Sequence, residues 1–151
     1  MLLEAVRGDR RRSEPLDLGA AEAIDPEGFE ERGPFDVVLE LVGAPNLRGN
    51  LKALATNGRI AVIGMSAGVK AEINLIALTA ARGKLMGSTL RARPLEEKAL
   101  AMRLVERHVL PLVESGQVEV PVADTFPLDE VERAYERFSG GGKVGKVVLT
   151  F

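Results

Sequence analysis

The sequence predicts an α/β fold built on a doubly wound, mostly parallel β-sheet. Apolar strand segments alternate with helical segments along the whole chain, as they do in parallel sheets covered by helices. The segment 60–63 is short and rich in β-branched residues, which is typical of a strand buried on both faces, and 35–41 is a second strong strand. A chain of 151 residues with 46% hydrophobic content can bury one such core.

The expected elements follow one another with short connections. Near the start they are a strand at 2–6, a helix at 14–18 with Ser13 as N-cap, and a brief strand at 23–24. The later elements are strands at 35–41, 60–63, 84–89, 118–122 and 146–151, with helices at 45–55, 74–81, 94–116 and 128–138. We expect a turn at Asn57–Gly58, a candidate helix break at Pro111, and Val131, Ala134 and Tyr135 facing inward.

The stretch GRIAVIGMSAG at 58–68 is the centre of the predicted fold. Its apolar run stops at Gly64, and further small residues follow up to Gly68. Open α/β sheets bind ligands beyond the carboxyl ends of their strands, so these glycines favour a ligand crevice. The alternative is an ordinary core strand followed by a flexible loop, because one glycine-rich turn is a weak signal.

Composition excludes several classes of function. The net charge of −2 gives no sign of a nucleic-acid or membrane-surface partner. The chain has no cysteine and one histidine, His108, which argues against disulfides and against a zinc site, and we assign His108 no role. No apolar run is long enough to span a membrane, and no signal-peptide core is present, so we expect a cytoplasmic protein.

Five motifs, taken in order, resemble one known family. They are DVVLELVGAP, NGRIAVIGMSAG, LMGSTLRARPLEEK, FPLDEVERAYERF and GKVGKVVLTF. Together they are similar to the cofactor-binding half of the medium-chain dehydrogenase/reductase superfamily, in particular its zinc-free NADPH:quinone oxidoreductase branch. The resemblance covers about 2–151. It implies a Rossmann-type domain and transfer of a hydride from NADPH to a quinone or an activated alkene, with the chemistry carried by the cofactor.

The resemblance also shows what this chain lacks. Members of the family carry a GroES-like substrate domain, then a first strand with a GxGxxG turn that holds the pyrophosphate. Neither is present here, so we expect 1–151 to be a partial NAD(P)-binding domain, truncated on its N-terminal side and inactive alone. A cloned fragment, a split gene product and a misassigned start all remain open.

Several residues are implied as cofactor contacts by the same resemblance. They are Gly43, then Ile63, Gly64 and Met65 along the nicotinamide ribose, then Gly87, Ser88 and Thr89 near the nicotinamide, and Lys143 or Lys146 from the C-terminal side. The alternative for each is an ordinary structural role, as a turn glycine, a strand residue or an exposed lysine. No catalytic residue is assigned.

The arginines after the first strand indicate the choice of cofactor. An acidic residue at the end of this strand would bind a ribose 2′-hydroxyl and select NAD, whereas Arg7 stands there. A guanidinium suits a 2′-phosphate, so we expect NADP(H), although Asp9 is nearby. The alternative is a solvated basic loop.

The family resemblance further implies a homodimer, paired through the edge strand at 84–89. The main rival function is a catalytically silent nucleotide-binding or dimerisation module of the same fold. A third candidate, an S-adenosylmethionine-dependent methyltransferase, is disfavoured because no early glycine-rich strand-loop with a following acidic residue is present. The substrate itself is not indicated by any residue of this chain.

Overall fold

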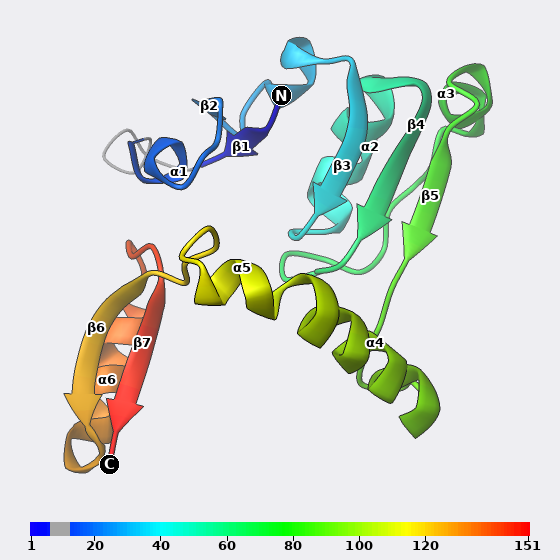
Figure 1. The fold of residues 1–151 in the computed structure, drawn as a ribbon. Helices are drawn as coiled ribbons and strands as arrows, with labels where there is room; N and C mark the ends of the chain where they lie inside the picture. The colour runs from blue at the N-terminus through cyan, green and yellow to red at the C-terminus, as the bar shows by residue number, and fades with distance from the viewer. Residues whose placement is uncertain (7–12) are drawn as a thin grey trace. The chain divides into compact units, whose positions relative to one another are not determined.

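The computed structural model describes residues 1–6 and 13–151, in two compact units, Met1–Arg93 and Pro94–Phe151. The predicted role of Arg7 therefore lies outside the described residues. In the first unit the elements are β1 (Leu3–Ala5), α1 (Ser13–Asp17), β2 (Glu22–Ile24), the 3-10 helix η2 (Phe29–Arg32), β3 (Phe35–Glu40), α2 (Ala44–Lys52), β4 (Leu54–Val62), α3 (Leu75–Ala80) and β5 (Lys84–Gly87) (Figure 1). In the second they are α4 (Leu95–His108), α5 (Leu110–Glu114), β6 (Val122–Pro127), the 3-10 helix η3 (Leu128–Glu130), α6 (Val131–Ser139) and β7 (Lys146–Thr150).

The main sheet of the first unit has the order β3-β4-β5, with every pair parallel. The connections run through α2 and α3, as parallel neighbours require. Pro45 lies in the first turn of α2, and the Asn74 side chain accepts hydrogen bonds from the first turn of α3. The predicted α/β class with parallel strands is confirmed.

The core of this unit lies between β4 and α2. Ile60 of β4 is completely buried and clusters with Leu51 of α2 and Leu54. Leu85 of β5 packs against the same cluster. The apolar run at 60–62 therefore lies in the central strand β4, as predicted, between β3 and β5, whereas Ile63 follows the strand and is half exposed.

The predicted turn at Asn57–Gly58 is wrong. Strand β4 begins at Leu54 and continues through both residues, and its register against β3 shifts between Phe35 and Val37. Asn57 adopts a φ of 63°, and its N–H donates to the Ala81 carbonyl, so the irregularity is anchored from outside the strand. The turn-forming pair makes a bulge rather than a chain reversal.

The described strands of the first unit form two sheets rather than one doubly wound sheet. β1 pairs with β2 in parallel, and β3 pairs with β4, but β1 and β3 do not pair with each other. On β3, Val37 and Leu39 are exposed, the latter by 62%. The described residues therefore leave part of the apolar surface of β3 uncovered.

The second unit pairs β6 with β7 in parallel, connected through α6. The candidate break at Pro111 is confirmed, since α4 ends at His108 and Pro111 lies in the first turn of α5. The predicted strand at 118–122 is displaced to Val122–Pro127. Tyr135 is 68% exposed, so its predicted inward position is wrong, whereas Ala134 is buried as expected.

No helix in the described part of the chain combines the length and the apolar content needed to span a membrane.

Candidate functional site

Two loops interlock at the carboxyl ends of β3 and β4. We call them the paired loops: 41–43, between β3 and α2, and 63–68, after β4. The Ala67 N–H donates to the Val42 carbonyl at 2.9 Å, and the Ala44 N–H donates to the Gly68 carbonyl at 3.0 Å. Backbone hydrogen bonds therefore join the loops at the edge of the sheet where α/β folds bind nucleotides.

Glycines make this close approach possible. A Cβ at Gly43 would lie 2.5 Å from the Gly68 carbonyl oxygen, and a Cβ at Gly64 would lie 2.3 Å from the Leu41 carbonyl oxygen. Gly43 also has a φ of 104°, which favours glycine. The structure thus accounts for both glycines by contact between the loops, and their predicted contact with a cofactor stays a prediction.

Glu40, which the sequence analysis did not single out, lies beneath the paired loops. It is the last residue of β3 and only 4% exposed. Its Oε1 accepts from the N–H groups of Val42 and Gly43 at 2.6 and 2.7 Å, and from Asn46 Nδ2 at 3.3 Å, while Oε2 accepts from Asn50 Nδ2 at 2.6 Å. A sequence signal existed, because Asn46 and Asn50 are four residues apart and share a face of α2.

The end of β5 lies beside this region. The register pairs Val62 with Gly87, and the Ser88 N–H donates to the Val62 carbonyl at 3.2 Å, so Ile63 and Ser88 leave the sheet together. Thr89 is held by its carbonyl, which accepts from Arg93 Nε at 2.6 Å. Of the residues predicted as cofactor contacts, the structure brings those at 43, 63–65 and 87–89 to one edge of the β3-β4-β5 sheet.

Side chains at this edge leave apolar surface uncovered. Ile63 and Met65 are 50% and 53% exposed. A Cβ at Gly87 would meet no atom within 4 Å. The edge therefore combines backbone held rigidly by the paired loops with open space and exposed apolar groups.

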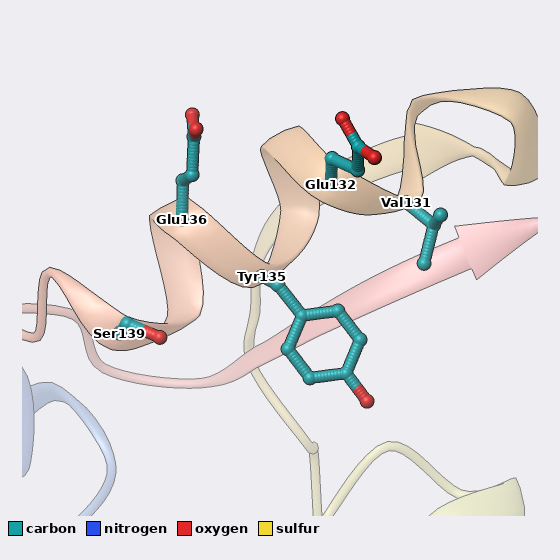
Figure 2. Close-up of a pocket in the computed structure, with 5 residues that line it drawn as sticks. All are labelled: Val131, Glu132, Tyr135, Glu136 and Ser139. Carbon is teal, nitrogen blue, oxygen red and sulfur yellow. The ribbon is translucent and has the colours of Figure 1, made fainter.

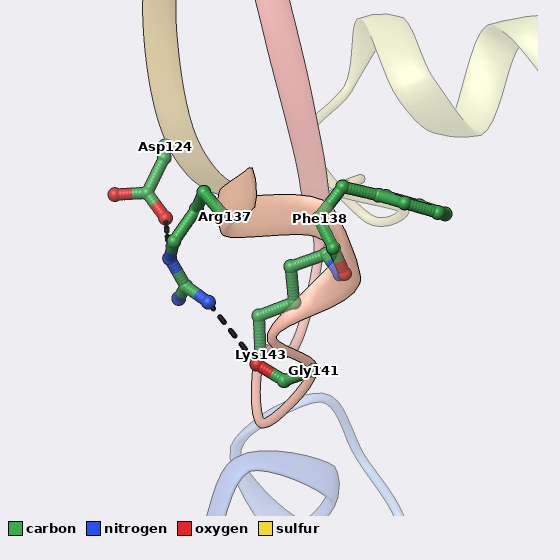
Figure 3. Close-up of polar contacts among 5 residues, drawn as sticks. All are labelled: Asp124, Arg137, Phe138, Gly141 and Lys143. Atoms are coloured by element: carbon green, nitrogen blue, oxygen red, sulfur yellow. Dashed lines mark hydrogen bonds and ion pairs between the residues drawn. The ribbon is translucent and has the colours of Figure 1, made fainter. Parts of the chain in front are cut away.

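Lys143, predicted to approach the cofactor, is engaged within the second unit. Its Nζ donates to the Phe138 carbonyl at 2.7 Å and lies 4.2 Å from the centroid of the Phe138 ring. Beside it, Arg137 donates to Asp124 Oδ2 at 2.6 Å and to the Gly141 carbonyl at 3.1 Å (Figure 3). A lysine at the C-terminal end of α6 also complements the helix dipole, so these contacts explain Lys143 without a ligand.

Lys146 is the first residue of β7, where it pairs with Val122 and is exposed. Its predicted approach to the cofactor, like that of Lys143, remains a prediction.

A shallow hollow runs along the outer side of α6. It is lined by Val131, Glu132, Tyr135, Glu136 and Ser139. Figure 2 shows Val131 and Tyr135 projecting to one side and the two glutamates to the other. None of these residues is a predicted site residue, and the hollow belongs wholly to the second unit, whereas the edge of the β3-β4-β5 sheet belongs to the first.

The predicted dimer strand is an edge strand in the structure. Within the described residues β5 has β4 as its neighbour on one side and no strand on the other. Met86 is exposed, whereas Leu85 packs on the core cluster. Pairing between two copies along this edge stays a prediction.

Comparison with known proteins decides the family. A family model described as "Zinc-binding dehydrogenase" matches residues 18–149. The chain belongs to the zinc-binding dehydrogenase family. The predicted membership of the medium-chain dehydrogenase/reductase superfamily, with its Rossmann-type fold, is thereby confirmed.

Two curated proteins and several solved structures are similar to this chain. The chain is 31% identical over 116 residues to acryloyl-coenzyme A reductase of Metallosphaera sedula, covering 77% of this chain and 32% of the relative. It is 28% identical over 123 residues to quinone oxidoreductase-like protein 2 of Bos taurus, covering 78% and 34%. The chain thus spans about a third of the length of these relatives.

Among solved structures, the chain is similar to the quinone oxidoreductase of Thermus thermophilus, whose complex with NADPH is also known. The TM-score is 0.81 with 29% identity, and the match covers 99% of this chain and 49% of the other. The likeness shows that this chain shares the fold of a protein known in complex with NADPH.

The name of the family implies zinc, but the residues of this chain do not fit that ion. The sequence contains no cysteine and one histidine. Within 1–6 and 13–151 there is no group of three His, Cys, Asp or Glu side chains placed to hold a metal. Zinc in proteins takes three or four such ligands, so no step of the reaction is assigned to a metal held by this chain.

Proposed function

We propose that this chain is the cofactor-binding part of an NADP(H)-dependent oxidoreductase that passes a hydride to a quinone or an activated alkene. The observation that carries the proposal is the pair of interlocked loops at the carboxyl ends of β3 and β4, where open parallel sheets bind nucleotides. Two relatives support it: a quinone oxidoreductase known with NADPH, and a reductase of acryloyl-coenzyme A, whose acryloyl group is an activated alkene.

The residues at this edge fit a flat, partly apolar cofactor. The exposed side chains of Ile63 and Met65 offer a surface against which a nicotinamide ring or its ribose can pack, and the space beside Gly87 is open. The backbone at Ser88 and Thr89 is fixed by bonds to Val62 and Arg93, so it can present polar groups in one orientation. The bound cofactor supplies the hydride, while the chain positions it and shields one face from water.

Selection of NADP(H) over NAD(H) is the part of the proposal that rests on the sequence. The supporting residue is Arg7, whose guanidinium suits a 2′-phosphate. Lys143 and Lys146 belong to the same proposal as contacts from the C-terminal side. Lys143 would have to exchange its bond to the Phe138 carbonyl for one to the cofactor.

The test is a titration of the ¹⁵N-labelled chain with NADPH and with NADH, up to millimolar concentration. We expect amide shifts at Ile63, Met65 and Ser88, larger with NADPH at equal concentration. Met65→Ser should weaken the response, because it removes apolar contact surface. Met102→Ser is the matched control, since Met102 on α4 is an equally exposed methionine outside the site. Equal responses of the two variants, or shifts confined to other residues, would contradict the proposed site.

The rival function, a catalytically silent dimerisation or nucleotide-binding module, has one specific observation in its favour. A Cβ at Gly43 would lie 2.5 Å from the Gly68 carbonyl oxygen and one at Gly64 2.3 Å from the Leu41 carbonyl oxygen, so contact between the loops explains these glycines without a ligand. The same titration separates the two functions. A chain that self-associates through β5 and shows no shift with either cofactor would be a dimerisation module.

A further inference from the structure

Within the described part of the chain, Glu40 is buried and its hydrogen bonds come from no cationic group. Acidic side chains are almost never fully buried unless they are paired, and the contacts of Glu40 come from backbone N–H groups and from two carboxamides of α2. A carboxylate offers two oxygens with about four acceptor sites, and four donors point at them. These four hydrogen bonds stabilise the negative charge of the carboxylate without a cationic partner.

Glu40 joins three parts of the first unit. One oxygen holds Val42 and Gly43 of the first paired loop, and the other is held by Asn50, which is itself buried in α2. The backbone carbonyl of Glu40 also accepts from the N–H groups of Ile63 and Gly64, at 2.9 and 3.1 Å. One residue therefore fixes both paired loops, one through its side chain and the other through its backbone.

The four hydrogen bonds to the Glu40 side chain require its carboxyl group to be ionised. Burial raises the pKa of the Glu40 carboxyl, but the hydrogen bonds that it accepts outweigh burial and hold the pKa below its ordinary value. No charged group contributes to this shift: the groups facing the carboxylate are the two N–H groups of the loop and the carboxamides of Asn46 and Asn50, none of which titrates. A protonated carboxyl would turn an O–H toward these donors and lose an acceptor site.

We propose that Glu40 is a positioning residue of the cofactor site: its buried carboxylate holds the first paired loop, and its backbone carbonyl holds the second. The inference rests on the proposed function for its link to the cofactor. Its structural half, the hold of the carboxylate on the loops, is measurable without any ligand. The Glu40 side chain is buried beneath the loops, so it acts through them.

The test compares Glu40→Gln with the unchanged chain by hydrogen exchange of backbone amides. Glutamine keeps the shape of the side chain, and Asn50 can rotate its carboxamide to accept from the new amide group, so the number of hydrogen bonds is retained and the charge is lost. Asp36→Asn is the matched control, because Asp36 is an exposed carboxylate on the same strand. Protection is read at Gly43 and Ala67 in the loops and at amides of β7 in the second unit.

At neutral pH we expect Glu40→Gln to lower protection at the loop amides about tenfold, since bonds to a charged group are stronger than neutral ones. Protection in β7 and in Asp36→Asn should not change. The folded-state pKa of Glu40 is below its unfolded value, so the hold is complete at neutral pH and is lost only as the pH falls through this lowered folded pKa. Protection of the loops should therefore fall in acid in the unchanged chain and stay level in Glu40→Gln.

Two results would overturn the inference: equal loop protection in Glu40→Gln and the unchanged chain at neutral pH, or a loss spread evenly over the whole first unit. A parallel NADPH titration of both proteins reads the proposed function separately. Weaker amide shifts at Ile63 and Met65 in Glu40→Gln would support the link to the cofactor. Absence of shifts in the unchanged chain would count against the proposed function, while the exchange result still decides the role of Glu40.

Discussion

Replacement of Gly64 by alanine tests whether the paired loops are held together by close backbone contact. The new Cβ would lie 2.3 Å from the Leu41 carbonyl oxygen and 3.0 Å from the Leu41 carbonyl carbon. Both atoms belong to the backbone, so no side-chain rotation relieves the clash. Ordinary contact begins near 3.4 Å, and the loops would have to separate by about 1 Å.

The cost of this separation can be estimated from the bonds that it stretches. Overpacking against a fixed neighbour costs about 1–3 kcal/mol. A shift of this size also breaks the bonds from the Gly64 N–H to Glu40 and from the Ala67 N–H to Val42, each contributing about 1 kcal/mol. We expect Gly64→Ala to lower the free energy of unfolding of the first unit by about 3–5 kcal/mol.

Urea unfolding followed by amide signals of β3 and β4 measures this quantity for the first unit alone. Gly87→Ala is the matched control: a Cβ there meets no atom within 4 Å, and Gly87 does not have a positive φ. Its stability should change by less than about 1 kcal/mol. If Gly64→Ala is as stable as Gly87→Ala, the loops do not depend on the close approach and the reasoning fails.

Four further outcomes are expected. Met86→Lys should convert a β5-paired dimer into monomers in a sedimentation experiment, because it places charge on the exposed edge while leaving the core residue Leu85 intact; a monomeric unchanged chain at micromolar concentration would contradict the dimer. Arg7→Asp should weaken NADPH binding by roughly 1–3 kcal/mol in a cofactor-competent assembly, the range for a lost bond to a charged group, with NADH affinity as the control. In an NADPH oxidation assay with a simple quinone, this chain alone should give no rate above background. A version extended with a GxGxxG strand and turn should give a higher rate, and equal rates would show that the added segment is not needed. Arg137→Lys should destabilise the second unit by about 1 kcal/mol, read by tyrosine fluorescence, because an ammonium does not present the fork that reaches Asp124 and Gly141 together.

Much of the fold follows from local sequence. The apolar runs at 35–41 and 60–63 lie largely in two strands of one parallel sheet, Pro45 and Asn74 mark helix starts close to those predicted, and the predicted helix break lies at Pro111. These features depend on side chains within a few residues of one another, so a single sequence carries them. The edge of the sheet where the site was predicted follows from the same information, because parallel strands place their carboxyl ends together.

Other features depended on contacts between distant segments. The pair Asn57–Gly58 has the composition of a turn, yet the bond from Asn57 to Ala81 keeps it within β4. The helical spacing of 128–138 predicted Tyr135 to be buried, but the sheet of two strands beneath α6 covers Ala134 and leaves Tyr135 exposed. Periodicity identifies an apolar face, and the width of the neighbouring surface decides how much of it is buried.

The sequence by itself determined the α/β class and the parallel pairing of its strands, and it predicted the sheet edge at which we propose that a nucleotide binds. These follow from short-range patterns and from the geometry of parallel sheets. Only the tertiary structure decided why Gly43 and Gly64 are glycines and why an acid ends β3. Glycine spacing is the same whether a backbone approaches a ligand or another loop. The burial of Glu40 depends on Asn50, ten residues away on α2, and only folding brings the four donors around one carboxylate.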